Sequence, residues 1–227
     1  MPLLFVINVA SLLVFDYVMY ISYYYTDTYG QKPNEQMKTL PLDDLIKNGS
    51  PFLGKVSAPI TIIDFSDFQC YCAIRFVKNT EPLINQTYIQ TGKVALVFGH
   101  LPNRGLDSMG AALAAQCTND QGKFWEFHNL LYSNHKPIDS GWVSKENLKN
   151  FASRIPGLDI KQFDSCFDRE KYKSFVQKDI DLALSFGFRE TSSFIVENRN
   201  GSNPEMLAGA LPFESFKAVI DKKISAG

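Results

Sequence analysis

Short apolar runs and amphipathic stretches alternate along this chain, and their order predicts its elements. Residues 59–65 and 93–98 are short, apolar and rich in β-branched side chains, which is typical of buried strands. Residues 71–88 have a helical pattern that stops near Gly92. A strand, a helix and a strand at this spacing predict a βαβ unit with a right-handed crossover.

A block of helices is predicted after the second strand. Small apolar residues fill its first helix, and Phe124, Phe127 and Leu131 share one face of the next. A later helix begins with Ser-x-Glu at Ser144, which indicates an N-terminal cap. The predicted helices of this block are 108–117, 122–132, 144–154, 159–166 and 170–187.

The chain returns to strands after the helical block. Residues 193–196 and 206–209 predict two strands, and Asn200-Gly201 between them is a strong signal for a hairpin turn. Pro212 begins a last helix that ends at about Ser225. The predicted order is therefore βαβ, a helical block and ββα.

The N-terminal segment, residues 2–25, is almost wholly apolar. A helix of this length spans a hydrocarbon core of about 30 Å. Asp16 costs about 2.5–3.5 kcal/mol near the centre of such a helix. A signal sequence would have a positively charged N-terminal region, but no Lys or Arg precedes Lys32. We therefore expect an uncleaved membrane anchor within residues 1–26. A signal peptide with a misassigned start and an extra buried helix are the alternatives.

Composition limits the remaining possibilities. Residues 27–51 are polar and predict a linker with one helical turn at 42–47, so the domain covers residues 52–227. A hydrophobic content of 45% in 227 residues suits one globular core plus an extension. The formal net charge of −1 offers no electrostatic basis for binding nucleic acid.

Candidate chemistry gathers where the first strand meets the first helix. Cys70 stands at the helix N-terminus, where the positive end of the helix dipole stabilises a thiolate, so we expect an exposed, reactive thiol. Cys72 points about 200° away from Cys70 on an α-helix. A Cys70–Cys72 disulfide would therefore need a distorted first turn and would be easily reduced. Cys72 is either the partner of Cys70 in a redox pair or a packing residue.

Metal and cofactor sites are not predicted. His100, His128 and His135 have no ligand spacing with the cysteines. A Cys-x-Cys pair can bind soft metals, but it has no third ligand nearby. The chain also has no glycine-rich phosphate loop, so we expect no cofactor.

Residues 61–76 resemble the active-site segment of the DsbA-like branch of the thioredoxin superfamily. The shared features are an acidic strand end, Asp67-Phe68-Gln69 and then a cysteine. The pattern Ala-Ala-x-Cys-x-x-x-x-Gly-Lys-Phe-Trp-Glu-Phe-His at 114–128 is fairly specific for this branch. The resemblance runs from about Lys55 to the C-terminus. It implies an α/β thioredoxin fold with an all-helical insertion at about 104–188.

The resemblance also implies roles for individual residues. Aligned without a gap, Cys70 takes the place of the attacking cysteine, and Ala73 stands where the resolving cysteine should be. Asp64 takes the place of a buried acid that relays protons, and burial would raise its pKa. Cys117 and Cys166 lie where many relatives have cysteines and are expected to form a structural disulfide; two buried thiols are the alternative.

A second departure from the family lies before the third strand. Ser192 occupies the position of the family's cis-proline, and Glu190 stands where glycine is common. A non-proline cis bond costs about 3–4 kcal/mol, so we expect a trans Thr191–Ser192 bond and a reshaped loop. By resemblance, Thr191 and Ser192 bind extended substrate backbone.

These residues favour an extracytoplasmic thiol–disulfide oxidoreductase with a degenerate active-site motif. It would act on protein thiols and disulfides, depend on a redox partner that recycles Cys70, and be held at the membrane by residues 2–25. Lys32 and Lys38 weakly favour the opposite orientation, but long domains translocate largely regardless of such charges. The rival hypothesis is a non-catalytic module that binds extended polypeptide at the membrane. A third possibility is that Ala73 is an engineered replacement of cysteine.

Overall fold

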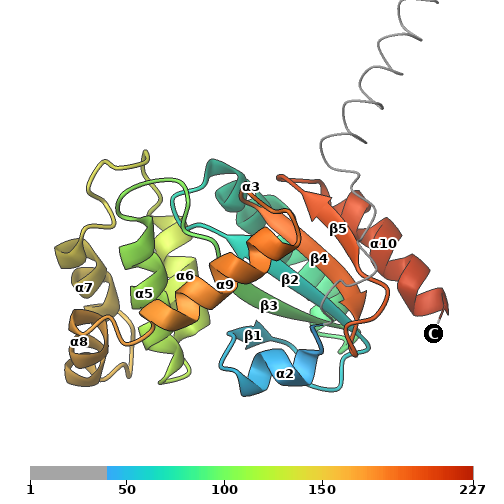
Figure 1. Ribbon diagram of the computed structural model, residues 1–227, viewed down its shortest axis with the longest axis horizontal. Helices are drawn as coiled ribbons and strands as arrows, with labels where there is room; N and C mark the ends of the chain where they lie inside the picture. Colours follow the sequence, from blue (N-terminus) through green and yellow to red (C-terminus); the bar gives the residue numbers. More distant parts are fainter. Residues whose placement is uncertain (1–39, 227) are drawn as a thin grey trace, which may run out of the picture. The chain divides into compact units, whose positions relative to one another are not determined.

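The computed structural model describes residues 40–226 (Figure 1). The predicted anchor at residues 2–25 and most of the predicted linker lie outside the described residues. Within residues 40–226, no helix is both long and apolar enough to span a bilayer. The first described helix is α2 (Leu42–Lys47), which matches the helical turn predicted there.

A five-stranded mixed sheet forms the centre of the domain, in the order β1-β3-β2-β4-β5. β2 and β3 are parallel, as the βαβ prediction requires, and the other neighbours are antiparallel. β1 was not predicted, because two residues are too short for any periodicity; its pairing with β3 defines it. The strands are β1 (Phe52–Leu53), β2 (Ile60–Ser66), β3 (Val94–His100), β4 (Ser193–Asn198) and β5 (Glu205–Ala208).

The helical segment after β2 is interrupted, so the prediction of one continuous helix over 71–88 was wrong. It consists of α3 (Tyr71–Asn79), α4 (Glu81–Ile84) and a π-helical turn, η1 (Asn85–Ile89). Pro82 explains the break at Thr80, because proline has no N–H to donate to the carbonyl of Lys78.

Five helices lie between β3 and β4, as predicted (Figure 1). Two of them have side-chain caps: Ser144 Oγ accepts from the Asn147 N–H at 3.4 Å, and Asp159 Oδ1 accepts from the Gln162 N–H at 3.1 Å. The helices are α5 (Ser108–Asn119), α6 (Phe124–Ser133), α7 (Lys145–Ser153), α8 (Ile160–Asp168) and α9 (Lys173–Ser185). The last element is α10 (Phe213–Ala226).

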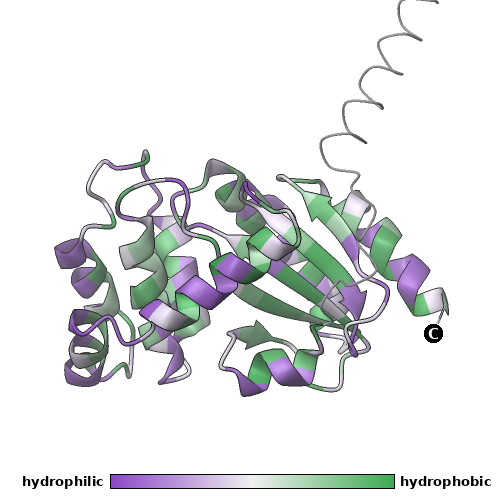
Figure 2. Cartoon of the chain, in the orientation of Figure 1, coloured by the Kyte–Doolittle hydropathy of each residue, from purple (hydrophilic) through white to green (hydrophobic). Residues whose placement is uncertain are grey.

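Two apolar cores hold helix α3 from opposite sides. Phe76 packs against Phe194 of β4 and Phe216 of α10, with ring centroids 4.6 and 5.4 Å away. Ile74 belongs to the second core, which fills the helical block and reaches the sheet at Phe98. The strands in Figure 2 are correspondingly apolar, whereas the outer helices carry polar stripes. Because both cores pack against α3, the start of this helix is fixed relative to the sheet.

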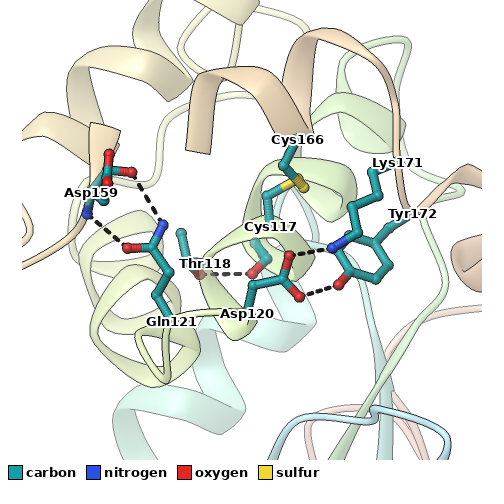
Figure 3. The surroundings of a disulfide bond; sticks show 9 residues. Cys117, Thr118, Asp120, Gln121, Asp159, Cys166, Lys171 and Tyr172 are labelled. Atoms are coloured by element: carbon teal, nitrogen blue, oxygen red, sulfur yellow. Dashed lines mark hydrogen bonds and ion pairs between the residues drawn. A yellow bond between two sulfur atoms is a disulfide. The ribbon is translucent and has the colours of Figure 1, made fainter. Parts of the chain in front are cut away.

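A disulfide joins helices α5 and α8 within the block (Figure 3). Cys117 and Cys166 are 49 residues apart in sequence, and their Cα atoms are 5.9 Å apart. Polar contacts surround the bridge: the Asp120 carboxylate binds Lys171 Nζ at 2.6 Å and accepts the hydroxyl of Tyr172. These contacts tie the end of α5 to the chain that follows α8.

Replacing both bridged cysteines, as Cys117→Ala with Cys166→Ala, should lower the free energy of unfolding by about 4 kcal/mol. The reason is that the bridge closes a long loop in the unfolded chain. Denaturant titration followed by circular dichroism measures the change. Adding dithiothreitol should destabilise the wild type by a similar amount and leave the double variant unchanged. An equal effect of dithiothreitol on both proteins would contradict this account.

Candidate active site around Cys70

Cys70 is the N-cap residue of α3, directly after the turn that leaves β2. Its backbone is extended, with φ −76° and ψ 126°, and its carbonyl accepts the first helical hydrogen bond from Ile74 at 3.2 Å. The thiol therefore lies at the end of the helix where unpaired N–H groups favour negative charge.

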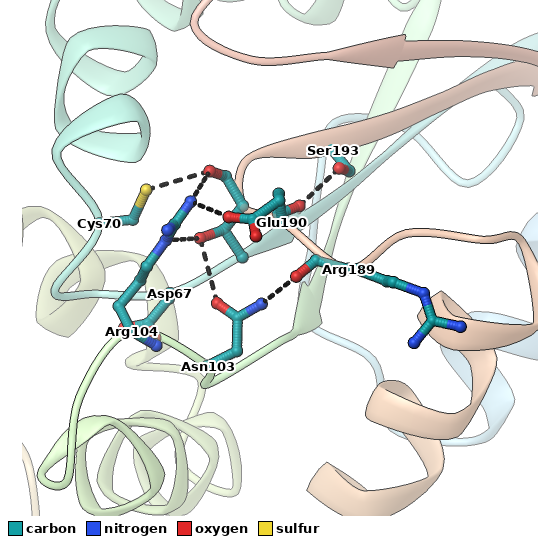
Figure 4. A network of polar contacts seen from close by, with 8 residues as sticks. Asp67, Cys70, Asn103, Arg104, Arg189, Glu190 and Ser193 are labelled. Atoms are coloured by element: carbon teal, nitrogen blue, oxygen red, sulfur yellow. Dashed lines mark hydrogen bonds and ion pairs between the residues drawn. The ribbon is translucent and has the colours of Figure 1, made fainter. Parts of the chain in front are cut away.

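The prediction that Cys70 is exposed was wrong: only 2% of the surface of Cys70 is accessible to solvent. The loop before β4 covers it, and the thiol donates a hydrogen bond to the Thr191 carbonyl at 3.2 Å (Figure 4). The thiol does point toward the loop at 191–193. In this arrangement the Cys70 side chain is almost completely shielded from solvent.

The Thr191–Ser192 bond is cis, so the expectation of a trans bond was wrong. The expectation considered the bond alone, whereas contacts from two distant segments, at residues 103–104 and at Ser66, hold this loop. Thr191 Oγ1 accepts from Arg104 Nε at 3.1 Å and lies 3.4 Å from Asn103 Oδ1. Ser192 Oγ lies 3.1 Å from Ser66 Oγ. Thr191 and Ser192 are nearly fully buried.

Arg104 is a site residue that sequence reasoning missed. Its guanidinium reaches over Cys70 from the loop after β3 (Figure 4). Arg104 Nη2 donates to the Thr191 carbonyl at 3.1 Å and pairs with Glu190 Oε2 at 2.6 Å. Burial lowers the pKa of Arg104, but the combined effect of nearby Cys70 and Glu190 in raising this pKa is larger, so the pKa lies above its ordinary value. No local pattern around residue 104 signals this role.

Asp67 fixes the turn that carries Cys70. Its carboxylate accepts from the backbone N–H groups of Gln69 and Arg104, both at 2.8 Å, and from Ser108 Oγ at 2.9 Å. Burial raises the pKa of Asp67, and these hydrogen bonds oppose the rise. The carboxylate thereby joins the start of α3 to the loop that carries Arg104.

Asp64 lies on β2, where its side chain is buried beneath α3. Burial raises its pKa to about 7, opposed by the hydrogen bond that Ser66 Oγ donates to it. Since Ser66 also contacts Ser192, two hydroxyl side chains connect the buried acid to the loop over Cys70. A carboxyl with this pKa can take up and release a proton near neutral pH.

The remaining candidate residues are Cys72, Ala73 and the histidines. Cys72 is a half-buried free thiol in the first turn of α3, and Ala73 is fully buried. Among residues 40–226, no cluster of three or more His, Cys, Asp or Glu side chains could hold a metal. His100 and His128 are packed among aromatic rings, and burial lowers the pKa of each to about 4.

Comparison with known proteins assigns the fold. The chain matches the family model described as Thioredoxin over residues 47–222. It is 33% identical over 175 residues to a protein of Bacillus anthracis named "Probable disulfide bond formation protein D", covering 76% of this chain and 77% of that protein. This chain belongs to the DsbA-like branch of the thioredoxin family. The predicted thioredoxin fold with an all-helical insertion is therefore confirmed.

Solved structures agree with this assignment. The oxidised form of BdbD from Bacillus subtilis has a TM-score of 0.71 at 27% identity, covering 85% of this chain and 100% of that one. α-DsbA1 from Wolbachia pipientis has a TM-score of 0.67 at 24% identity, covering 78% of this chain and 92% of that one. The second likeness concerns the fold alone.

The raised pKa of Asp64 predicts how stability depends on pH. In the folded protein its pKa is about 7, whereas an unfolded Asp titrates near ~4. The stabilising effect of the protonated form is complete below pH ~4 and is lost as pH rises through about 7. Asp64→Asn cannot ionise, so its stability relative to wild type should rise by about 4 kcal/mol between pH 4 and 7.5.

Urea titrations at several pH values measure this difference. Asp168→Asn is the control, because Lys145 and Lys149 lower the pKa of this exposed carboxyl. Its stability relative to wild type should stay nearly constant between pH 4 and 7.5 and should rise only as the pH falls below about 4. A pH-independent difference between Asp64→Asn and wild type would show that Asp64 is ionised in the folded state throughout.

Proposed function

We propose that this DsbA-like chain is a protein thiol–disulfide oxidoreductase that acts outside the cytoplasm, with Cys70 as the reacting sulfur. The observation that carries the proposal is the position of Cys70, at the N-terminus of α3 and against the loop at 191–193. The name of the Bacillus anthracis relative, a probable disulfide bond formation protein, supports the same activity.

The exchange begins when the loop moves and the Cys70 thiolate attacks a substrate disulfide. A bond forms between Cys70 Sγ and one substrate sulfur, while the other substrate sulfur leaves as a thiolate and takes a proton. If Cys72 then attacks Cys70 Sγ, a Cys70–Cys72 disulfide forms and the substrate leaves reduced; the reverse sequence oxidises a substrate. If a substrate thiol attacks instead, the substrate disulfide is isomerised and Cys70 is regenerated.

The surrounding residues have supporting roles in this proposal. Asp64 carries the proton, because its pKa of about 7 suits exchange near neutral pH and Ser66 connects it to the loop. Thr191 and Ser192 present the backbone that an extended substrate meets once the loop opens. A soluble or membrane-bound redox partner of this DsbA-like protein returns the cysteines to their starting state.

The proposed location rests on two features. Residues 2–25 form the membrane anchor, residues 27–51 the linker, and residues 52–227 the external domain, against which α2 at the end of the linker packs: Leu42 is fully buried and its N–H donates to the Arg199 carbonyl at 2.9 Å. The Cys117–Cys166 disulfide favours an oxidising compartment, where structural disulfides persist. The apolar length of residues 2–25 suits a bilayer-spanning helix.

A non-catalytic module that binds extended polypeptide is the second candidate. Two observations favour it: Ala73 has no sulfur to resolve a mixed disulfide, and Cys70 is buried under the loop. The two functions differ in turnover, since only an oxidoreductase exchanges disulfides repeatedly.

Insulin reduction and refolding of a reduced, unfolded substrate distinguish the two candidates. Cys70→Ser should lower turnover at least about 100-fold, because a hydroxyl at this site is not a nucleophile toward disulfides. Cys72→Ser is the matched variant: it should abolish net oxidation and reduction but retain isomerisation of a scrambled substrate. A wild type no more active than Cys70→Ser would favour the binding module.

The anchor is tested by fractionating cells that express the full chain. We expect the protein in the membrane fraction after washing with alkaline carbonate, and a variant lacking residues 2–25 in the soluble fraction. Recovery of the full-length chain from the soluble fraction at its full mass would overturn the anchor. A soluble product shortened at its N-terminus would indicate a cleaved signal peptide instead.

A further inference from the structure

We infer that Arg104 stabilises the Cys70 thiolate and that Glu190 limits how much of this charge the sulfur receives. The inference rests on the proposed function, since it concerns the same thiol. It assigns a positioning role to Arg104 and Glu190. This role is deduced from the contacts around the site and not from the DsbA-like motif.

The thiol and the guanidinium converge on one atom (Figure 4). The Thr191 carbonyl oxygen accepts from Cys70 Sγ at 3.2 Å and from Arg104 Nη2 at 3.1 Å. Arg104 Nε also donates to Thr191 Oγ1, which holds the guanidinium in place beside the sulfur. A cationic group held this close to a cysteine favours the thiolate.

Ionisation of Cys70 changes this arrangement in a definite direction. When the thiol proton passes to solvent, the sulfur can no longer donate to the Thr191 carbonyl and instead faces the negative end of its dipole. Arg104 has five N–H donors and can turn one of them from the carbonyl to the sulfur. Ionisation thus exchanges the hydrogen bond from the Cys70 thiol to the Thr191 carbonyl for one from Arg104 to the thiolate. The loop at 191–193 then has one hydrogen bond fewer to α3.

Glu190 opposes this effect. Its carboxylate lies 2.6 Å from the same Nη2 atom and competes with the thiolate for the guanidinium. The Glu190 side chain is 66% exposed and that of Arg104 is 31% exposed, so water weakens the pair. Removing the charge of Glu190 should therefore leave more of the Arg104 charge to the sulfur.

Other titratable groups face Cys70 and contribute a constant background. They are Asp64 on β2, Asp67 in the preceding turn, Tyr132 of α6 and His135, which contacts the Gln69 carbonyl. Cys72, on the same helix as Cys70, is serine in every variant below. Burial raises the pKa of both Asp67 and Tyr132. Because these groups are the same in each variant below, differences between variants report on Arg104 and Glu190.

The test is the rate at which iodoacetamide alkylates Cys70 between pH 5 and 10. All variants carry Cys72→Ser, and Cys117 and Cys166 are bridged, so that Cys70 alone reacts. The quantity compared is the rate at pH 6.5 divided by the plateau rate at high pH. This ratio reports how far Cys70 is ionised at pH 6.5, because a change in access to the buried sulfur that is the same at both pH values affects both rates equally.

Arg104→Gln should lower this ratio about fivefold to tenfold, and Arg104→Lys should restore part of it. Glu190→Gln should raise the ratio about twofold to threefold. Arg189→Gln is the matched control: its side chain points away from Cys70 in Figure 4, and the ratio should not change. Near-ultraviolet circular dichroism checks that each variant keeps its packing.

Several outcomes would overturn the inference. If Arg104 only held the loop closed, Arg104→Gln would raise both rates by one factor and leave the ratio unchanged. If Arg104→Gln does not fold, an unchanged ratio in Glu190→Gln overturns the inference by itself. Alkylation does not require turnover. If the wild type is an active enzyme and the ratio in Arg104→Gln is unchanged, the role of Arg104 is rejected and the proposed function stands. The expected shifts in a protein without turnover reject the oxidoreductase function and leave the charge assignment standing.

Discussion

The hydrogen bond from the Cys70 thiol to the Thr191 carbonyl is the contact on which the site depends. It joins residues 121 positions apart, at the start of α3 and just before β4. β2 and β4 are neighbours in the sheet, so the ends of these two strands bring the two segments together. The two apolar cores that hold α3 then fix the sulfur against the loop.

Burying a thiol and a loop together requires that their polar groups find partners, because an unpaired buried polar group is costly. Asp67 and Arg104 supply them. Asp67 accepts three hydrogen bonds that join the turn before Cys70 to the loop after β3. Arg104 extends from that loop to Thr191 and Glu190. The closed site is therefore a network of polar groups surrounded by an apolar core.

Charge is distributed unevenly around the sulfur. Beneath α3, burial raises the pKa of Asp64 to about 7, so a neutral Asp64 does not oppose ionisation of Cys70 below that pH. Glu81 is half-buried with one carboxylate oxygen shielded from solvent, and the charge of Asp64 adds to the effect of burial in raising its pKa to about 8. On the loop side, Arg104 carries a full positive charge. This asymmetry favours a thiolate that turns from the carbonyl toward the guanidinium.

The amino-acid sequence by itself determined the order of the strands and helices apart from β1 and the breaks after α3, the helical insertion, the DsbA-like family and the position of Cys70 at a helix N-terminus. These features depend on local periodicity, on caps and on spacing, which neighbouring residues encode. Only the tertiary structure decided that Cys70 is buried, that the Thr191–Ser192 bond is cis, and that Arg104 and Glu190 belong to the site. Those outcomes depend on contacts between segments that are far apart in the chain, such as Arg104 and Thr191, which are 87 positions apart, and no local pattern records such contacts.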